Sequence, residues 1–201
     1  VIMRDEEIMF PGTFEYCERV AQRPEVNFHW ITAHQPVLNL YNRVEPIFFV
    51  FDPLVSPEDW VRKPPDICYD IPEQNIDSLV TRKRFPTEKD KKLVKVMGLR
   101  VSESPNRKLG LVSSGGYLTK GNANQPGVIA ARPIYDWTDG HVWRAMKEFG
   151  WDYNVSYNTM HRMGIAKRQL RIAPPTQTRH YLPLLQMSIK AWPRWFDRVA
   201  D

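Results

Sequence analysis

The chain is poor in the residues that define several protein classes. It has two cysteines, Cys17 and Cys68, among 201 residues, and these are too few and too isolated for a disulfide framework or a zinc site. It has no run of 18 apolar residues and no basic leader followed by an apolar stretch. We therefore expect a cytoplasmic protein with no membrane partner and no structural metal, in which both thiols are buried or half-buried.

The net positive charge is small, but the positive side chains are unevenly distributed along the chain. The 28 Lys and Arg residues against 23 Asp and Glu give a net charge of +5. Positive side chains crowd one segment, and such a run is usually a solvated face. The same run could attract nucleic acid or another polyanion in a salt-dependent manner. The candidate polyanion-binding residues are Arg82, Lys83, Arg84, Lys91 and Lys92.

The residues that are present predict an α/β fold. Apolar residues make up 42% of the chain and aromatic residues 12%, which is enough to bury a core. Strand-like and helix-like patterns alternate along the chain. We expect strands at 1–3, 26–30, 47–51 and 94–99, where 26–30 and 47–51 are either successive strands of one sheet or a local hairpin. We expect helices that start at Thr13 as the N-cap, after Pro36 and at Ser56.

Further along, the composition predicts two irregular segments and several helices. Residues 66–85 read as a surface insertion, and the glycines and asparagines of 110–127 as a mobile loop. Thr138 is expected to cap a helix that runs from Asp139 to Phe149, with Phe149 on its buried face and Gly150 as its stop. A second helix is expected around Met160, and a C-terminal helical segment is expected to be interrupted at Pro193.

Two arginines follow the strand expected at 94–99. Arg100 and Arg107 flank Ser102, Ser104 and Asn106. Ligands of open α/β sheets bind beyond the carboxyl ends of the strands, and the arginine fork matches phosphate and sulfate oxygens. The alternative is a basic surface loop whose arginines pair with local carboxylates. On the first interpretation, Arg100 and Arg107 are the candidate catalytic residues.

The same stretch resembles the phosphoadenosine phosphosulfate (PAPS) reductase family of adenine nucleotide alpha hydrolases. The resemblance is carried by Gly98-Leu99-Arg100-x-x-Glu103-Ser104-x-x-Arg107, by the residues 133–138 and by Val142-Trp143. Residues 149–154 and 171–174 are similar to the branch found in prophage co-activator proteins and related to DNA phosphorothioation enzymes. Residues 1–7 and 13–16 are similar to the family's second strand and the helix after it.

This resemblance implies a fold and a ligand. The fold would be a parallel twisted sheet flanked by helices, of the HUP-type Rossmann-like kind, over residues 1–175, with a C-terminal helical extension over 176–201. The ligand would be ATP or PAPS, either alone or with Mg²⁺, and nucleic acid or a partner protein would be further partners. The implied nucleotide-binding residues are Asp5, Glu6, Arg100, Ser102, Glu103, Ser104 and Arg107. For Asp5 and Glu6 the alternative is a solvated acidic turn.

The family's Ser-Gly-Gly-x-Asp-Ser phosphate loop does not occur in these residues. The nearest string, 113–117, lacks the acid and the hydroxyl and reads as a turn. We therefore expect a fragment that lacks its first strand and its phosphate loop. Three functions stay open: adenylyl or sulfur-group transfer linked to nucleic-acid modification, sulfonucleotide reduction with a thiol from outside this chain, and non-catalytic binding of nucleotide or DNA as a co-regulator.

Overall fold

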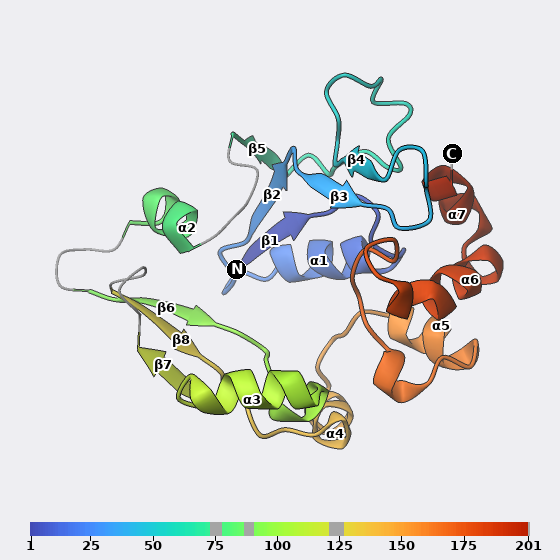
Figure 1. Ribbon diagram of the computed structural model, residues 1–201. Helices are drawn as coiled ribbons and strands as arrows, with labels where there is room; N and C mark the ends of the chain where they lie inside the picture. Colours follow the sequence, from blue (N-terminus) through green and yellow to red (C-terminus); the bar gives the residue numbers. More distant parts are fainter. Residues whose placement is uncertain (73–77, 87–90, 121–126, 201) are drawn as a thin grey trace. The chain divides into compact units, whose positions relative to one another are not determined.

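The computed structural model describes residues 1–72, 78–86, 91–120 and 127–200, and the chain divides into two compact units. Unit 1 comprises residues 1–75 and 153–201, and unit 2 comprises residues 76–152. The described residues form the mixed α/β architecture expected from the sequence, with a small parallel sheet, flanking helices and a helical C-terminal segment (Figure 1). No helix in this part of the chain is long and apolar enough to cross a membrane.

Unit 1 is built around a three-stranded parallel sheet. Its strands are β1 (Ile2–Asp5), β2 (His29–Ala33) and β5 (Tyr69–Ile71), in the order β1-β2-β5. The central strand β2 is apolar along most of its length because a strand of a parallel sheet is covered on both faces. Trp30 and Ile31 in β2 are fully buried. The expected strand at 26–30 is therefore placed slightly too early.

The helix α1 (Thr13–Ala21) follows β1, but its cap differs from the prediction. The N-cap is Gly12, with φ +93°, and not Thr13. A Cβ atom at Gly12 would lie 2.8 Å from the Ser156 hydroxyl, so the turn has no room for a side chain. Thr13 is the first helical residue, and its hydroxyl oxygen accepts a hydrogen bond from the Asn154 amide at 2.9 Å. The hydroxyl thus joins two distant segments of unit 1.

A hairpin replaces the helix expected after Pro36. The strands β3 (Pro36–Leu38) and β4 (Ile47–Phe49) pair in antiparallel register. Val37 is buried between two exposed neighbours, and this alternation is typical of a strand with one covered face. Neither alternative for the runs at 26–30 and 47–51 is correct, because β4 pairs with β3 and not with β2. The helix start expected at Ser56 is also wrong, because residues 57–60 form only turns before the two prolines Pro64 and Pro65.

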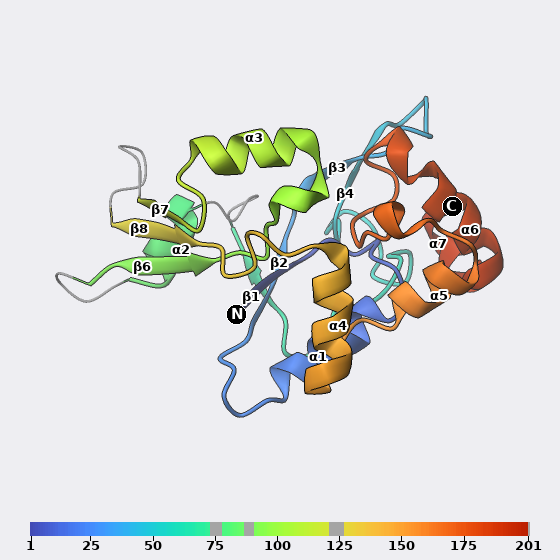
Figure 2. The same ribbon diagram turned by 90° about the horizontal axis from the view of Figure 1, so that it is seen from below.

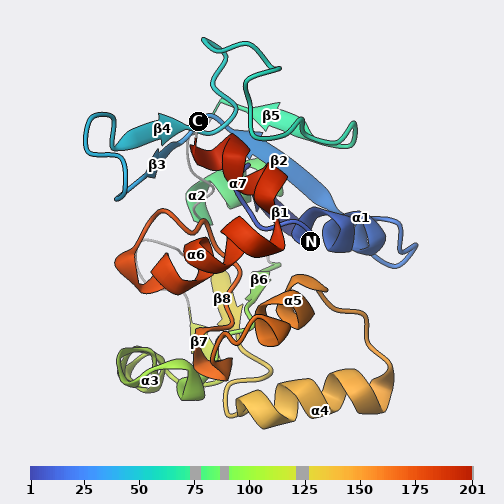
Figure 3. The ribbon, with the colours of Figure 1, turned by 90° about the vertical axis from the view of Figure 1, so that its right-hand side faces the viewer.

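The C-terminal helices pack on a second core of unit 1. They are α5 (Ser156–Arg162), α6 (Leu182–Ala191) and α7 (Pro193–Ala200), and the short 3-10 segments Lys167–Gln169 and Arg179–Tyr181 lie between α5 and α6 (Figure 3). The core contains Phe10, Met160, Ile165, Leu184 and Met187. The rings of Trp192 and Trp195 each lie 5.2 Å from that of Phe10. The break predicted at Pro193 is confirmed.

The described residues of unit 2 form a small mixed sheet and several helices (Figure 2). Its sheet has the order β6-β8-β7, and the pair β6 and β8 is parallel. The elements of the unit are α2 (Ser78–Arg84), β6 (Leu93–Val96), the 3-10 segment η1 (Val101–Glu103), α3 (Pro105–Ser113), β7 (Leu118–Lys120), β8 (Val128–Ala131) and α4 (Asp139–Phe149).

Several predictions for these segments need correction. The strand expected at 94–99 ends at Val96, and Val94 and Val96 are 52% and 67% exposed because β6 is an edge strand. The cap at Thr138 and the stop at Gly150 are confirmed, whereas Phe149 is 64% exposed and not buried. The expected insertion at 66–85 contains β5 and α2. The expected loop at 110–127 contains the end of α3 and the strand β7, and its residues 121–126 lie outside the described part.

Candidate functional site

The local fold of unit 2 determines where the two predicted arginines, Arg100 and Arg107, lie. After β6, the 3-10 segment η1 turns the backbone, and Ser104 then begins α3 as its N-cap. The Ser104 hydroxyl accepts a hydrogen bond from the Arg107 backbone N–H at 3.1 Å, and Pro105 occupies the first helical turn. Arg107 therefore lies in the first turn of α3, while Arg100 lies just before η1.

Both guanidinium groups pair with one carboxylate. The Arg100 Nε lies 3.7 Å from the Glu103 Oε1, and the Arg107 Nε lies 3.3 Å from the Glu103 Oε2. The Arg100 Nη1 also pairs with the Asp139 Oδ1 at 2.9 Å. The Arg100 side chain is 15% exposed and that of Arg107 is 44% exposed. The site thus holds two positive charges opposite two carboxylates.

The two serines of the motif form hydrogen bonds with the backbone around this site. The Ser102 hydroxyl donates to the Trp137 carbonyl at 2.7 Å and lies 3.5 Å from the Arg100 Nη1. Ser104 serves as the cap of α3. These contacts explain why small hydroxyl residues stand at these two positions. Their predicted contact with a bound nucleotide stays a prediction.

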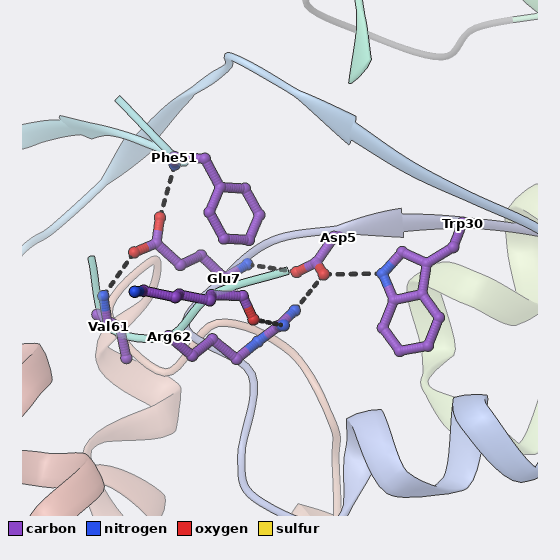
Figure 4. A network of polar contacts seen from close by, with 7 residues as sticks. Asp5, Glu7, Trp30, Phe51, Val61 and Arg62 are labelled. Carbon is purple, nitrogen blue, oxygen red and sulfur yellow. Dashed lines mark hydrogen bonds and ion pairs between the residues drawn. The ribbon is translucent and has the colours of Figure 1, made fainter. Parts of the chain in front are cut away.

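The acidic residues that follow β1 lie in unit 1, and two of them are buried. Asp5 has no exposed surface, and its Oδ2 accepts hydrogen bonds from the Trp30 indole N–H at 2.8 Å and from the Arg62 guanidinium (Figure 4). Its Oδ1 accepts the Glu7 backbone N–H at 2.8 Å. The Arg62 guanidinium in turn lies 3.2 Å from the centre of the Phe14 ring. The solvated turn considered for this segment is therefore wrong for Asp5.

Glu7 joins two further segments of unit 1. Its carboxylate accepts the Phe51 backbone N–H at 2.6 Å and the Val61 backbone N–H at 2.7 Å (Figure 4). Burial raises the pKa of Glu7, although these two hydrogen bonds and the nearby Arg62 act in the opposite direction. Glu7 and Phe51 both have a positive φ, at 54° and 48°. Backbone strain thus coincides with a buried charge at the carboxyl end of β1.

The acidic residues of this segment are poor candidates for holding Mg²⁺ in this arrangement. Both oxygens of Asp5 already accept hydrogen bonds from protein donors, and the Glu6 carboxylate pairs with Arg4. Among the described residues, no group of three or more His, Cys, Asp or Glu side chains is placed to hold a metal ion. The predicted contact of Asp5 and Glu6 with a nucleotide stays a prediction.

The two cysteines match the expectation of half-buried thiols. Cys17 and Cys68 are both partly buried and unpaired. Burial is the largest cause of a raised pKa in each case, to about 11 for Cys17 and to about 12 for Cys68. Reactive thiols have lowered pKa values, because the thiolate is the nucleophile. Neither cysteine has the surroundings of a catalytic thiol.

The candidate polyanion residues fall in and after α2. Lys83, Lys91 and Lys92 are exposed, and Arg84 is partly buried. The backbone of Arg82 lies in α2, but its side chain lies outside the part that the structure describes. Exposure of these lysines is compatible with a solvated face and with a polyanion contact.

Sequence reasoning missed a cavity of about 390 Å³ at the carboxyl ends of β2 and β5. Thr32, His34 and Asp70 provide polar groups to its wall. The signal in the sequence was the position of His34 directly after an apolar strand, because the ends of parallel strands form ligand-binding edges. Asp70 could not be found in the same way, because its strand β5 has only three residues.

The comparisons with known proteins give one distant relative. No protein-family profile matches the sequence, and no solved structure matches it. The chain is 24% identical over 196 residues to "Uncharacterized protein YbdN" of Escherichia coli (strain K12), and the match covers 87% of this chain and 47% of the relative. The chain therefore spans about half the length of the relative it matches. The name of that protein states no activity, so the comparison assigns no function.

Proposed function

We propose that this chain binds an adenine nucleotide, ATP or a sulfonucleotide such as PAPS, and holds its phosphate or sulfate oxygens between Arg100 and Arg107. The observation that carries the proposal is the pairing of both guanidinium groups with the single carboxylate of Glu103. Two arginines that share one small anionic group are spaced to share another. The proposed reaction is adenylyl or sulfur-group transfer, on a fold of the PAPS reductase type.

In this account Glu103 orients the two arginines until the ligand binds. A carboxylate has one negative charge, whereas a nucleotide triphosphate has several and offers more acceptor oxygens to each guanidinium fork. Glu103 therefore competes with the ligand, and a nucleotide must replace some of its contacts. The ion pair with Asp139 holds the Arg100 side chain at the N-terminus of α4 while the nucleotide replaces Glu103.

The direct test is titration calorimetry with ATP and with PAPS. We expect Arg100→Ala and Arg107→Ala each to weaken binding by about 10- to 150-fold, which corresponds to about 1.5–3 kcal/mol for a charge-assisted hydrogen bond. Arg144→Ala is the matched control, because Arg144 also pairs with a carboxylate on a helix, Glu148, and its side chain is 74% exposed. Equal affinity in all four proteins would contradict the proposal.

The alternative functions differ from this one in measurable ways. The raised pKa values of Cys17 and Cys68 argue against sulfonucleotide reduction by a thiol of this chain, so that alternative needs a thiol from outside it. A co-regulator would bind the nucleotide without turnover. Release of pyrophosphate or AMP from ATP by the protein would support an enzyme, whereas tight binding with no product would support the binding role.

A further inference from the structure

A further cavity of unit 1 is formed by the loop that joins β3 to β4 and by the helices α6 and α7. Its volume is about 510 Å³, which is in the range of small-molecule sites. The loop lines it with polar side chains, and the two helices line it with apolar ones. These side chains include Asn39, Asn42 and Arg43 on the loop and Leu185, Phe196 and Val199 on the helices. The cavity can therefore hold a molecule with one polar and one apolar end.

The polar wall is held in place by the backbone of the loop. The Asn39 N–H donates to the Pro46 carbonyl at 2.7 Å, and the Leu40 N–H donates to the Thr176 carbonyl at 3.0 Å. Thr176 also lines the cavity, and it is only 3% exposed. The loop is therefore fixed both to its own hairpin and to the segment before α6, so the cavity is formed before a ligand binds.

The amide groups of Asn39 and Asn42 each have one free end. The Asn39 Oδ1 accepts the Tyr41 backbone N–H at 3.1 Å. The Asn42 Oδ1 accepts the backbone N–H groups of Val44 and Glu45 at 3.0 Å and 2.9 Å. These contacts determine which end of each amide is the oxygen, and neither Nδ2 has a hydrogen-bond acceptor among the described residues. Both asparagines therefore offer N–H donors to a bound molecule.

Arg43 gives this wall a single positive charge. Its guanidinium group makes no hydrogen bond or ion pair with the residues that the structure describes, and no carboxylate from them lines the cavity. The adjoining cavity shares the two asparagines and carries the carboxylates of Glu45, Asp52 and Asp59. These carboxylates repel a ligand with several negative charges, whereas a single negative charge is balanced by Arg43.

The apolar wall restricts the rest of the ligand. The side chains of Leu185, Phe196 and Val199 are only partly buried where they line the cavity. An apolar group that packs on them removes further apolar surface from water. A carboxylate has one negative charge, matches the fork of a guanidinium group and has acceptor sites left for the two amides. The ligand that fits both walls is therefore one carboxylate on an apolar body.

From these features we infer that the cavity binds a monocarboxylate with an apolar body, such as a medium-chain fatty acid. The carboxylate accepts hydrogen bonds from Arg43 and from the amides of Asn39 and Asn42, while the body packs on α6 and α7. This site goes beyond the proposed function and does not rest on it. Its residues belong to unit 1, whereas Arg100 and Arg107 belong to unit 2.

Three ligands that differ by one feature test this inference. Octanoate has both features, octanamide replaces the charged carboxylate by a neutral amide, and acetate lacks the apolar body. Each is titrated at pH 7 into the unaltered 201-residue chain, and the side-chain NH2 resonances of Asn39 and Asn42 are followed by NMR. These resonances are assigned as the ones missing from Asn39→Asp and Asn42→Asp. We expect saturable shifts with octanoate and at least about 10-fold weaker binding of octanamide and of acetate.

Variants then assign the binding to the loop. Asn42→Asp keeps the oxygen that accepts the backbone N–H groups but replaces the NH2 donor by a second carboxylate oxygen. It should weaken octanoate binding by about 10-fold or more, with Asn39 as the reporter, and Arg43→Gln should weaken it by about 5-fold or more. The matched controls are Asn158→Asp and Arg194→Gln, at exposed positions that do not line the cavity, and both should bind octanoate as the unaltered protein does.

Circular dichroism checks that each variant folds. If Asn42→Asp does not fold, Arg43→Gln and the three ligands still decide. Absence of saturable binding, binding of octanamide or acetate as tight as that of octanoate, or unchanged affinity in either loop variant would overturn the inference.

Discussion

The Trp30 indole N–H donates a hydrogen bond to the Asp5 carboxylate at 2.8 Å, and neither residue has exposed surface. The two residues lie on the neighbouring strands β1 and β2. The same carboxylate pairs with Arg62, which comes from a distant segment. Asp5 therefore joins the sheet to the segment that contains Arg62.

Removal of the Asp5 carboxylate should destabilise the protein strongly. Asp5→Ala leaves the Arg62 guanidinium and the Trp30 N–H buried without their acceptor, and breaking a buried ion pair costs about 3–5 kcal/mol. Urea unfolding measures the loss. Glu58→Ala is the control, because the Glu58 side chain is 76% exposed and solvent screens its pair with Lys63, so its loss should change the stability much less. A loss for Asp5→Ala no larger than that of the control would show that the network contributes little.

The stability of the protein should depend on the ionisation of Glu7. Because burial raises its pKa in the folded chain above the ordinary value of 4.5, the folded state binds this proton more tightly than the unfolded state. The resulting stabilisation is complete below about pH 4.5 and is lost as the pH rises through the raised pKa. We expect the free energy of unfolding, taken relative to Glu7→Gln, to fall as the pH is raised from 4.5 to 8.

That measurement has an internal control. Titration of other groups contributes equally to both proteins, so the difference between them isolates Glu7. A gap between the unaltered protein and Glu7→Gln that stays constant over this pH range would contradict the assigned direction of the shift.

Both thiols should react slowly in the folded protein. With pKa values of about 11 and about 12, thiolate fractions at pH 8 are about one in a thousand for Cys17 and about one in ten thousand for Cys68. Alkylation by iodoacetamide, followed by mass spectrometry, should be about 100-fold or more slower in the folded protein than in urea. Rapid native alkylation of either residue would contradict the assigned direction of its pKa shift.

The basic segment after α2 gives a separate prediction about nucleic acid. If it contacts phosphates, the affinity for duplex DNA falls steeply with salt, and Lys91→Gln and Lys92→Gln each reduce the slope of log K against log salt by about 1. Lys190→Gln, an exposed lysine in α6, serves as the control. Affinity that does not change with salt would mean that the segment is only a solvated face.

The sequence predicted best the elements whose signals are local. The helix α4 has a Thr138 cap, an aspartate in its first turn and a Gly150 stop, and each is read directly from neighbouring residues. Pro193 likewise marks the break between α6 and α7. By contrast, the residues after Pro36 form a strand because β4 pairs with them from about ten positions away. Local preference gives no information on such a partner.

The sequence predicted the part of the candidate site whose contacts are local, and it did not predict the part whose contacts are long-range. Arg100, Glu103 and Arg107 are spaced so that a 3-10 turn and the first turn of α3 bring them into contact. The partners of Asp5 were not predictable, because Trp30 and Arg62 reach it through the packing of the sheet. The cavity at His34 and Asp70 depends on the pairing of β2 with β5, and the sequence analysis placed the residues of β5 in a surface insertion.

The most direct test of the central claim is the affinity of Glu103→Gln for ATP, measured by titration calorimetry beside the unaltered protein at the same ionic strength. The substitution keeps the size of the side chain but removes the charge that both arginines share. If Glu103 occupies the place of a ligand anion, ATP should bind more tightly to the variant, by about 10-fold or more. Unchanged or weaker binding would contradict the account, because it would show that Glu103 and ATP do not compete for the two guanidinium groups.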